Sequence, residues 1–160
     1  MDFGTVLVGS VCIALCAMPF VLTTRGRKKR EKALVMSLKN LAKNENSEIT
    51  QYETCGNYAI GIDEVKKIVF FQLQSKEITK YEIINLATIK KCRIANISNT
   101  VSGGDKIIEK LNLHLTPIVK SKEDTILEFY NADLSFQLSG ELQSIQEWNT
   151  LINKLLVDKK

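Results

Sequence analysis

An apolar run that ends abruptly at a basic cluster constrains this chain more than any other feature. No charged side chain occurs from Phe3 to Thr24, a stretch of about 22 residues, and roughly 20 apolar residues suffice to cross a hydrocarbon core as a helix. Backbone amides in lipid must be satisfied within the segment, so a span of this length is expected to be helical. We therefore predict a transmembrane anchor over residues 1–24.

The basic cluster directly after the run predicts the orientation of this anchor. The cluster comprises Arg25, Arg27, Lys28, Lys29 and Arg30. Lys and Arg are retained on the cytoplasmic side of a membrane, whereas the N-terminal flank offers only Asp2 and the amino terminus. We expect a single-pass, N-out signal-anchor in the inner (plasma) membrane with a cytoplasmic C-terminal domain. Anionic lipid headgroups would bind the cluster, each basic residue contributing on the order of 1 kcal/mol.

Two other interpretations of the apolar run stay open. An exported domain behind a cleaved or uncleaved signal is one, because Ala14 to Ala17 offers small residues for cleavage; signal peptides, however, carry positive charge before a shorter apolar region. Self-association is the other. Cys12 and Cys16 share a helix face with small neighbours, and small residues let membrane helices approach closely.

The net charge of the whole chain originates at the membrane junction. The formal charge is +4, from 22 basic and 18 acidic residues. Six basic and two acidic residues occur up to Lys32, so residues 33–160 carry 16 of each sign. A nucleic-acid binder would spread basic residues over its folded domain, and we therefore expect no nucleic-acid partner.

A basic segment with a helix, residues 25–46, precedes the main domain. Its apolar residues recur at spacings of three and four, which predicts a helix over 28–44; they are Ala33, Leu34, Leu38, Leu41 and Ala42. Residues 47–158 are then long enough to form one domain with its own core.

Short β-rich segments follow one another through most of this domain. They are Ile49–Thr54, Tyr58–Ile62, Lys67–Leu73, Glu77–Ile83, Ala87–Ile97, Leu111–Thr116 and Thr125–Tyr130. Ser98–Asp105 has the composition of a loop. Seven strands at this spacing predict an antiparallel sandwich or barrel.

The end of the chain returns to a helical period. Its apolar stripe consists of Leu142, Ile145, Trp148, Ile152, Leu155 and Leu156. Such a stripe must be buried, and a curved sheet is the expected host. Ser139 is the predicted N-cap. The predicted fold class is thus α+β.

From Glu48 to Val157 the order of elements resembles the pleckstrin-homology (PH) superfold, as found in bacterial PH-like domains. Three sequence segments are similar to segments of that family: Gly61–Phe71, Tyr81–Ile84 and Gln146–Ile152. The resemblance implies a seven-stranded antiparallel, partly open barrel capped by the C-terminal amphipathic helix. Trp148 would fill the open end while its indole N–H finds an acceptor at a strand edge.

The resemblance also allows a test of lipid recognition. PH domains that bind phosphoinositides carry Lys and Arg in the loop between their first two strands. The corresponding residues here, Thr54 to Asn57, include no basic side chain. Phosphate recognition needs charge-assisted donors at close range, so we expect no phosphoinositide site there.

No arrangement of residues predicts catalytic, cofactor-binding or metal-binding chemistry. His114 should face solvent from its strand, with no Cys, Asp or second His placed to assist it. Cys55 and Cys92 are expected to be ordinary thiols, although a bond between them stays open, and irregular alternation around Cys92 indicates a bulge. Asp63-Glu64 and Glu123-Asp124 are typical of hairpin turns.

One surface feature remains, a small basic patch on adjacent strands. It would consist of Lys66, Lys67, Lys90, Lys91 and Arg93. Taken together, the sequence predicts a non-enzymatic, membrane-anchored PH-like module that presents a protein-interaction surface or self-associates. The alternative is a lipid or small-ligand binding module on the same fold.

Overall fold

The computed structural model of this chain describes residues 26–75, 79–100, 106–135 and 137–157. The chain divides into two compact units, Met1–Ala33 and Leu34–Lys160. The predicted anchor, residues 1–24, lies outside the described residues. Within the described ranges no helix combines the length and the apolar character that crossing a membrane requires.

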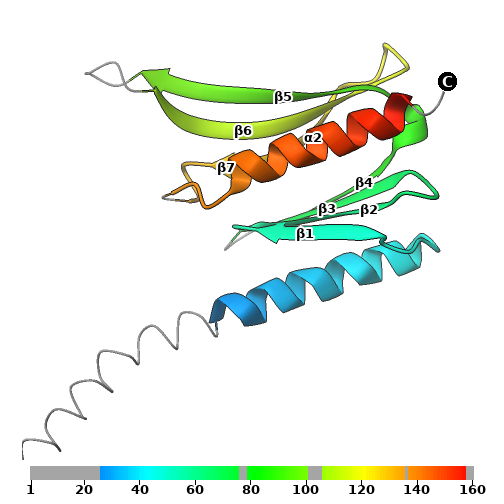
Figure 1. The fold of residues 1–160 in the computed structure, drawn as a ribbon, viewed down its shortest axis with the longest axis horizontal. Helices are drawn as coiled ribbons and strands as arrows, with labels where there is room; N and C mark the ends of the chain where they lie inside the picture. Colours follow the sequence, from blue (N-terminus) through cyan, green and yellow to red (C-terminus); the bar gives the residue numbers. More distant parts are fainter. Residues whose placement is uncertain (1–25, 76–78, 101–105, 136, 158–160) are drawn as a thin grey trace, which may run out of the picture. The chain divides into compact units, whose positions relative to one another are not determined.

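Seven antiparallel strands form two separate sheets (Figure 1). The four-stranded sheet has the order β1-β2-β3-β4 and comprises β1 (Gln51–Cys55), β2 (Tyr58–Asp63), β3 (Ile68–Gln74) and β4 (Thr79–Asn85). A short 3₁₀ turn, η1 (Leu86–Thr88), leads into the three-stranded sheet, which comprises β5 (Ile89–Thr100), β6 (Lys106–Pro117) and β7 (Thr125–Asn131). The prediction of seven antiparallel strands with a C-terminal helix is confirmed, and this arrangement is compatible with a PH-like fold.

The centre of the four-stranded sheet is buried on both faces. Every residue of β2 is buried, since alternate side chains face the core between the sheets and the outer surface of the sheet. The outer surface is covered by residues 34–44, the second part of a helix that the described residues show over 26–44. This confirms the helix predicted over 28–44.

Small residues on β2 let this helix approach closely. Leu34, Leu38 and Ala42 pack against Ala59 and Phe70. A Cβ atom added to Gly61 would lie 3.0 Å from Cδ2 of Leu38, so the helix fits against a position without a side chain.

The three-stranded sheet alternates as the sequence predicts. Leu111, Leu113 and Leu115 of β6 are fully buried in the core, whereas His114 and Thr116 lie on the opposite, partly exposed face. This follows from the period of two in a strand.

The hairpin of β5 and β6 is longer than predicted. Strand β6 begins at Lys106, and residues 98–100, which we expected in a loop, belong to β5. Backbone pairing in the ladder outweighs the polar composition of this segment. The predicted bulge is confirmed, because the register of β5 shifts between Ile89 and Lys91 and again between Ile97 and Ser98.

The C-terminal helix, α2 (Glu141–Val157), runs between the two sheets in Figure 1. Ile145, Trp148 and Ile152 belong to the main core together with residues of both sheets. The helix begins one residue after Gly140, whose carbonyl accepts the first helical hydrogen bond from Ser144. The predicted N-cap at Ser139 is therefore wrong: Ser139 precedes the cap position, and its backbone N–H bonds to the carboxylate of Glu141.

Candidate interaction surfaces

The basic cluster occupies the first turns of the helix over 26–44. Arg27, Lys28, Lys29 and Arg30 are all exposed, and Nε of Arg27 lies 3.1 Å from Oε1 of Glu31 one turn later. Arg25 lies outside the described residues. An exposed basic turn of this kind has the chemistry to bind anionic headgroups, and that binding stays a prediction.

The turn between β1 and β2 is short and lies against a carboxylate. Only Gly56 and Asn57 connect the strands, and Gly56 has a φ of +52°, a conformation that favours glycine. A Cβ at Gly56 would lie 2.6 Å from Oε1 of Glu141, which is 2% exposed. The turn therefore abuts a carboxylate and offers no cationic donor to an anion.

Aromatic rings pack together in the core between the two sheets. The ring centroid of Tyr58 lies 4.6 Å from that of Phe129 and 5.6 Å from that of Phe71. A cavity beside Phe129, also lined by Asn57 and Glu141, has a volume of about 10 Å³, whereas small-molecule sites typically occupy roughly 300–1,000 Å³. This hollow has room for about one water molecule.

A buried polar network joins α2 to β1. The hydroxyl of Tyr58 donates to Oγ of Ser144 (2.7 Å), which donates to Oε2 of Glu53 (2.8 Å). The indole N–H of Trp148 donates to the same oxygen at 2.7 Å. The predicted acceptor for Trp148 at a strand edge is thus confirmed, since β1 is an edge strand. Burial raises the pKa of Tyr58, so this hydroxyl stays protonated and the network acts as a structural tie.

A side-chain amide on α2 covers the outer edge of β5. Nδ2 of Asn153 donates to the carbonyl of Cys92 (3.1 Å), and Oδ1 of Asn153 accepts from the backbone N–H of Cys92 (3.4 Å). Both backbone groups point away from β6, so the amide takes the place of a neighbouring strand. No pattern in the sequence predicts this role, because an Asn on the polar side of a helix is ordinary.

The two cysteines of the described domain form no disulfide with each other. Burial raises the pKa of the Cys92 thiol to about 12. A protonated thiol is a poor nucleophile, so Cys92 serves as a small apolar core residue.

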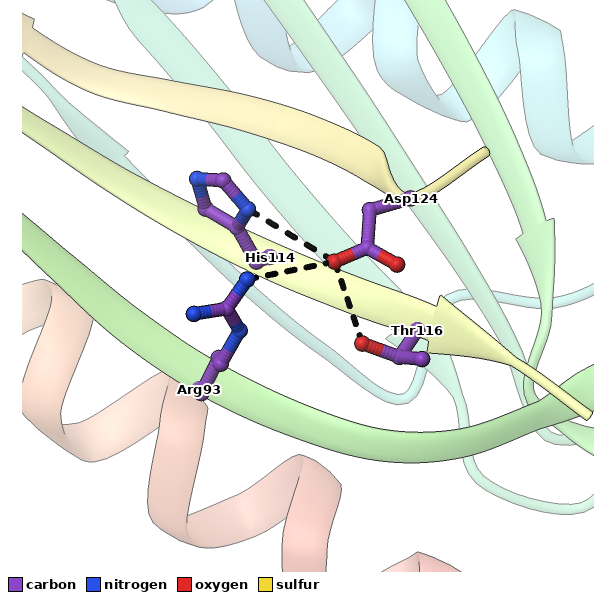
Figure 2. A network of polar contacts seen from close by, with 4 residues as sticks. All are labelled: Arg93, His114, Thr116 and Asp124. Atoms are coloured by element: carbon purple, nitrogen blue, oxygen red, sulfur yellow. Dashed lines mark hydrogen bonds and ion pairs between the residues drawn. The ribbon is translucent and has the colours of Figure 1, made fainter. Parts of the chain in front are cut away.

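Four polar residues gather on the outer face of the three-stranded sheet, as Figure 2 shows. Oδ2 of Asp124 accepts from Oγ1 of Thr116 (3.1 Å) and from Nη2 of Arg93 (3.4 Å), and it lies 3.8 Å from Nδ1 of His114. The expectation that no Asp is placed beside His114 is therefore wrong: the turn before β7 brings Asp124 back over β6.

This cluster lacks the parts of a catalytic site. The His114 side chain is 17% exposed, so the prediction that it faces solvent is only partly right. The hydroxyl of Thr116 bonds to Asp124 and not to the imidazole, and no nucleophile–base pair results. Among the described residues no group of three or more His, Cys, Asp and Glu could hold a metal ion.

The predicted basic patch does not lie on adjacent strands. Lys66 and Lys67 are in the turn before β3, whereas Lys90, Lys91 and Arg93 are on β5 of the other sheet. Nζ of Lys67 bonds to the carbonyl of Leu155 at the end of α2. The five basic residues therefore lie in two different parts of the domain and do not form one patch.

The most exposed strand of the four-stranded sheet is β4. Among the described strands it has a hydrogen-bonded neighbour, β3, on one side only. Six of its seven residues are exposed, including Tyr81 (47%) and Ile83 (43%). Beside β4 opens a cleft of about 180 Å³. The cleft is lined by Phe71, Leu73, Lys80, Glu82, Ile126 and Glu128.

Comparison of the chain with protein-family models, with curated proteins and with solved structures finds no match in any of the three.

Proposed function

We propose that this chain is a non-enzymatic, single-pass membrane protein whose PH-like domain presents a protein-interaction surface on the cytoplasmic side. The anchor rests on the apolar run Phe3–Thr24, and its orientation rests on the basic residues that follow. The helix over 26–44 leads from that basic segment into the domain.

The PH-like assignment is supported by the order of the strands and by the tryptophan. Four strands and then three, followed by a helix whose Trp148 is 2% exposed within the core, is the arrangement that the family resemblance implies. The hydrogen bond from Trp148 to Glu53 on β1 gives the buried indole N–H its partner.

One contrast carries the proposed interaction role: the barrel interior is filled, while the edge strand β4 is open. A row of unpaired backbone groups on a strand is a template for an added strand from a partner. The exposed side chains of Tyr81 and Ile83 would supply apolar contacts to that partner. Aromatic residues are enriched at such interfaces.

A lipid or small-ligand function has weaker support. The hollow beside Phe129 measures about 10 Å³ and the cleft beside β4 about 180 Å³, both below the roughly 300 Å³ at which ligand sites begin. A larger hollow of about 430 Å³ along α2, beside Leu151, is a shallow surface depression that would not enclose a ligand. The β1–β2 turn faces Glu141 in place of basic side chains.

Affinity capture of the detergent-solubilised full-length protein tests the interaction role. We expect a partner that is retained by the wild type and lost with Ile83→Asp, which places a charge on the open edge. Val65→Asp is the matched control, because Val65 is 87% exposed and lies in a turn outside β4. Equal capture by both variants would exclude β4 as the interaction surface.

The topology is tested separately. A reporter enzyme fused after Lys160 should behave as a cytoplasmic protein. Digestion of the domain by protease added to intact cells would contradict the proposed orientation.

A further inference from the structure

The open edge of β4 has a charge pattern that complements itself. Lys80 and Glu82 lie on one face of the strand and Tyr81 and Ile83 on the other, since side chains alternate along a strand. Tyr81 pairs with Gln72 and Ile83 with Phe70 on β3, so these two residues share the outer face of the sheet.

Antiparallel pairing of β4 with a second β4 would place opposite charges against each other. When Tyr81 lies opposite Tyr81 of the second copy, Lys80 of each copy lies opposite Glu82 of the other, and Thr79 lies opposite Ile83. Directly opposed charges of unlike sign and paired aromatic rings both stabilise neighbouring strands.

Neighbouring registers are less favourable. A register centred on Lys80 would oppose two lysines, and one centred on Glu82 would oppose two glutamates, each of which is destabilising. Registers centred between residues would align the outer face of one copy with the inner face of the other. Among the registers compared, the charge pattern therefore favours the one centred on Tyr81.

The edge of β4 is more exposed than the edge of β5 near α2. Asn153 of α2 bonds to the backbone of β5 at Cys92. On β4, by contrast, the residues from Thr79 to Ile83 are all exposed.

We propose that β4 pairs with β4 of a second copy of this chain, antiparallel about Tyr81, to form one continuous sheet across a two-fold symmetric dimer. Such an interface is isologous, with the same residues contributed by each copy. The proposal deepens the proposed function by naming the partner, and it rests on that function for one point: anchoring in one membrane raises the effective concentration of the two edges.

A charge-reversal series on the full-length protein tests the register. In detergent, measured by light scattering and sedimentation, Lys80→Glu and Glu82→Lys should each weaken self-association by about tenfold or more, because each places two pairs of like charges in the interface. The double variant Lys80→Glu/Glu82→Lys should return to within about threefold of the wild type, since the unlike pairs are restored.

Cross-linking tests the same geometry independently. Opposed residues in an antiparallel pair have Cα atoms about 4.5–5.5 Å apart, within reach of a disulfide. Tyr81→Cys should therefore give a covalent dimer on oxidation, beyond any that the wild-type cysteines give. Ile83→Cys is the control, because two copies of residue 83 would lie roughly 13 Å apart along the strands.

Three results would overturn the proposal: a monomeric wild type in both detergent and lipid nanodiscs, a dimer that the charge reversals leave unchanged, or a different protein found paired to β4. Circular dichroism shows whether each variant is folded, and exposed residues should tolerate these changes. The dimer and the proposed function can fail separately. If the double variant regains self-association but the reporter fused after Lys160 is not cytoplasmic, the dimer is supported and the proposed function is contradicted.

Discussion

The two sheets of this domain differ in how many of their faces are buried. The four-stranded sheet has the main core on one face of β2 and residues 34–44 on the other, so that all of β2 is buried. The three-stranded sheet buries only its inner face, and its outer face carries the polar cluster around Asp124. The centre of one sheet thus depends on apolar packing on both faces, whereas the outer face of the other sheet is partly exposed and carries polar side chains beside the exposed Ile126.

The edges of the sheets differ as well. On β5 a side chain of α2 bonds to the outer backbone groups of Cys92, whereas β4 is exposed. Exposed edges are sites of association, and this contrast is why we propose β4 as the edge that a partner would bind.

The largest effect should come from the covered outer face of the four-stranded sheet. Leu38→Ala removes a fully buried side chain that packs against Ala59 and Phe70, and we expect a loss of about 2–5 kcal/mol in the free energy of unfolding. Met36→Ala on the same helix is the control, because Met36 is 59% exposed. Urea unfolding measures both, and equal stability of the two variants would mean that the helix does not pack there.

A smaller effect should come from uncovering the edge of β5. Asn153→Ala leaves the N–H and C=O of Cys92 without their side-chain partner, which should cost about 1–3 kcal/mol. Hydrogen exchange at the Cys92 amide should accelerate as well. The exposed Gln146 of the same helix supplies the control variant, Gln146→Ala. Unchanged exchange at Cys92 would contradict the role of Asn153.

Next in size should be a pH-dependent effect at the β2–β3 turn. Burial raises the pKa of Asp63, but hydrogen bonds from the backbone N–H groups of Lys66 (2.9 Å) and Glu48 (3.1 Å) outweigh it and hold that pKa below its usual value. A depressed pKa stabilises the fold above the unfolded-state value, and this contribution is lost as the pH falls through the folded-state pKa. Asp63→Asn should therefore destabilise the protein at neutral pH.

Unfolding measured from neutral to acidic pH checks this expectation. The difference between the wild type and Asp63→Asn should shrink as the pH falls below 3.8, the ordinary value for this carboxyl. A difference that is constant with pH would show that the charge of Asp63 does not contribute.

The smallest effect should come from the outer face of the three-stranded sheet. Arg93 is 54% exposed and lies 3.4 Å from Asp124, and exposed ion pairs contribute about 0.2–1 kcal/mol. Arg93→Ala should cost no more than this, and less in high salt. Lys91→Ala on the same strand is the control. A loss comparable to that of Leu38→Ala would show that this face is covered by a partner and is not a free polar surface.

Residues with a strong local pattern were predictable. Leu111, Leu113 and Leu115 alternate with polar residues, and the structure buries all three. The stripe containing Trp148 and Ile152 predicted the helix and the burial of these two residues, whereas Leu142 of the same stripe is 40% exposed. In these elements one face is apolar, so periodicity alone identifies the core.

Contacts between distant residues were not predictable in the same way. Asp124 was expected only in a hairpin turn, yet it lies beside His114 because the strand pairing of β6 and β7 sets their separation. Asn153 and Cys92 are 61 residues apart, and their hydrogen bonds depend on where α2 crosses β5. No local sequence pattern predicts contacts between residues that are so far apart along the chain.

The sequence by itself determined the charge distribution, the α+β class and the succession of seven strands and a helix, since each depends on side chains that are near one another along the chain. Only the tertiary structure decided which faces and edges remain exposed. That outcome depends on which element covers which, as residues 34–44 cover one sheet and Asn153 covers one edge. Exposure is a property of packed neighbours, and this is why β4 could be identified as the open edge only after folding.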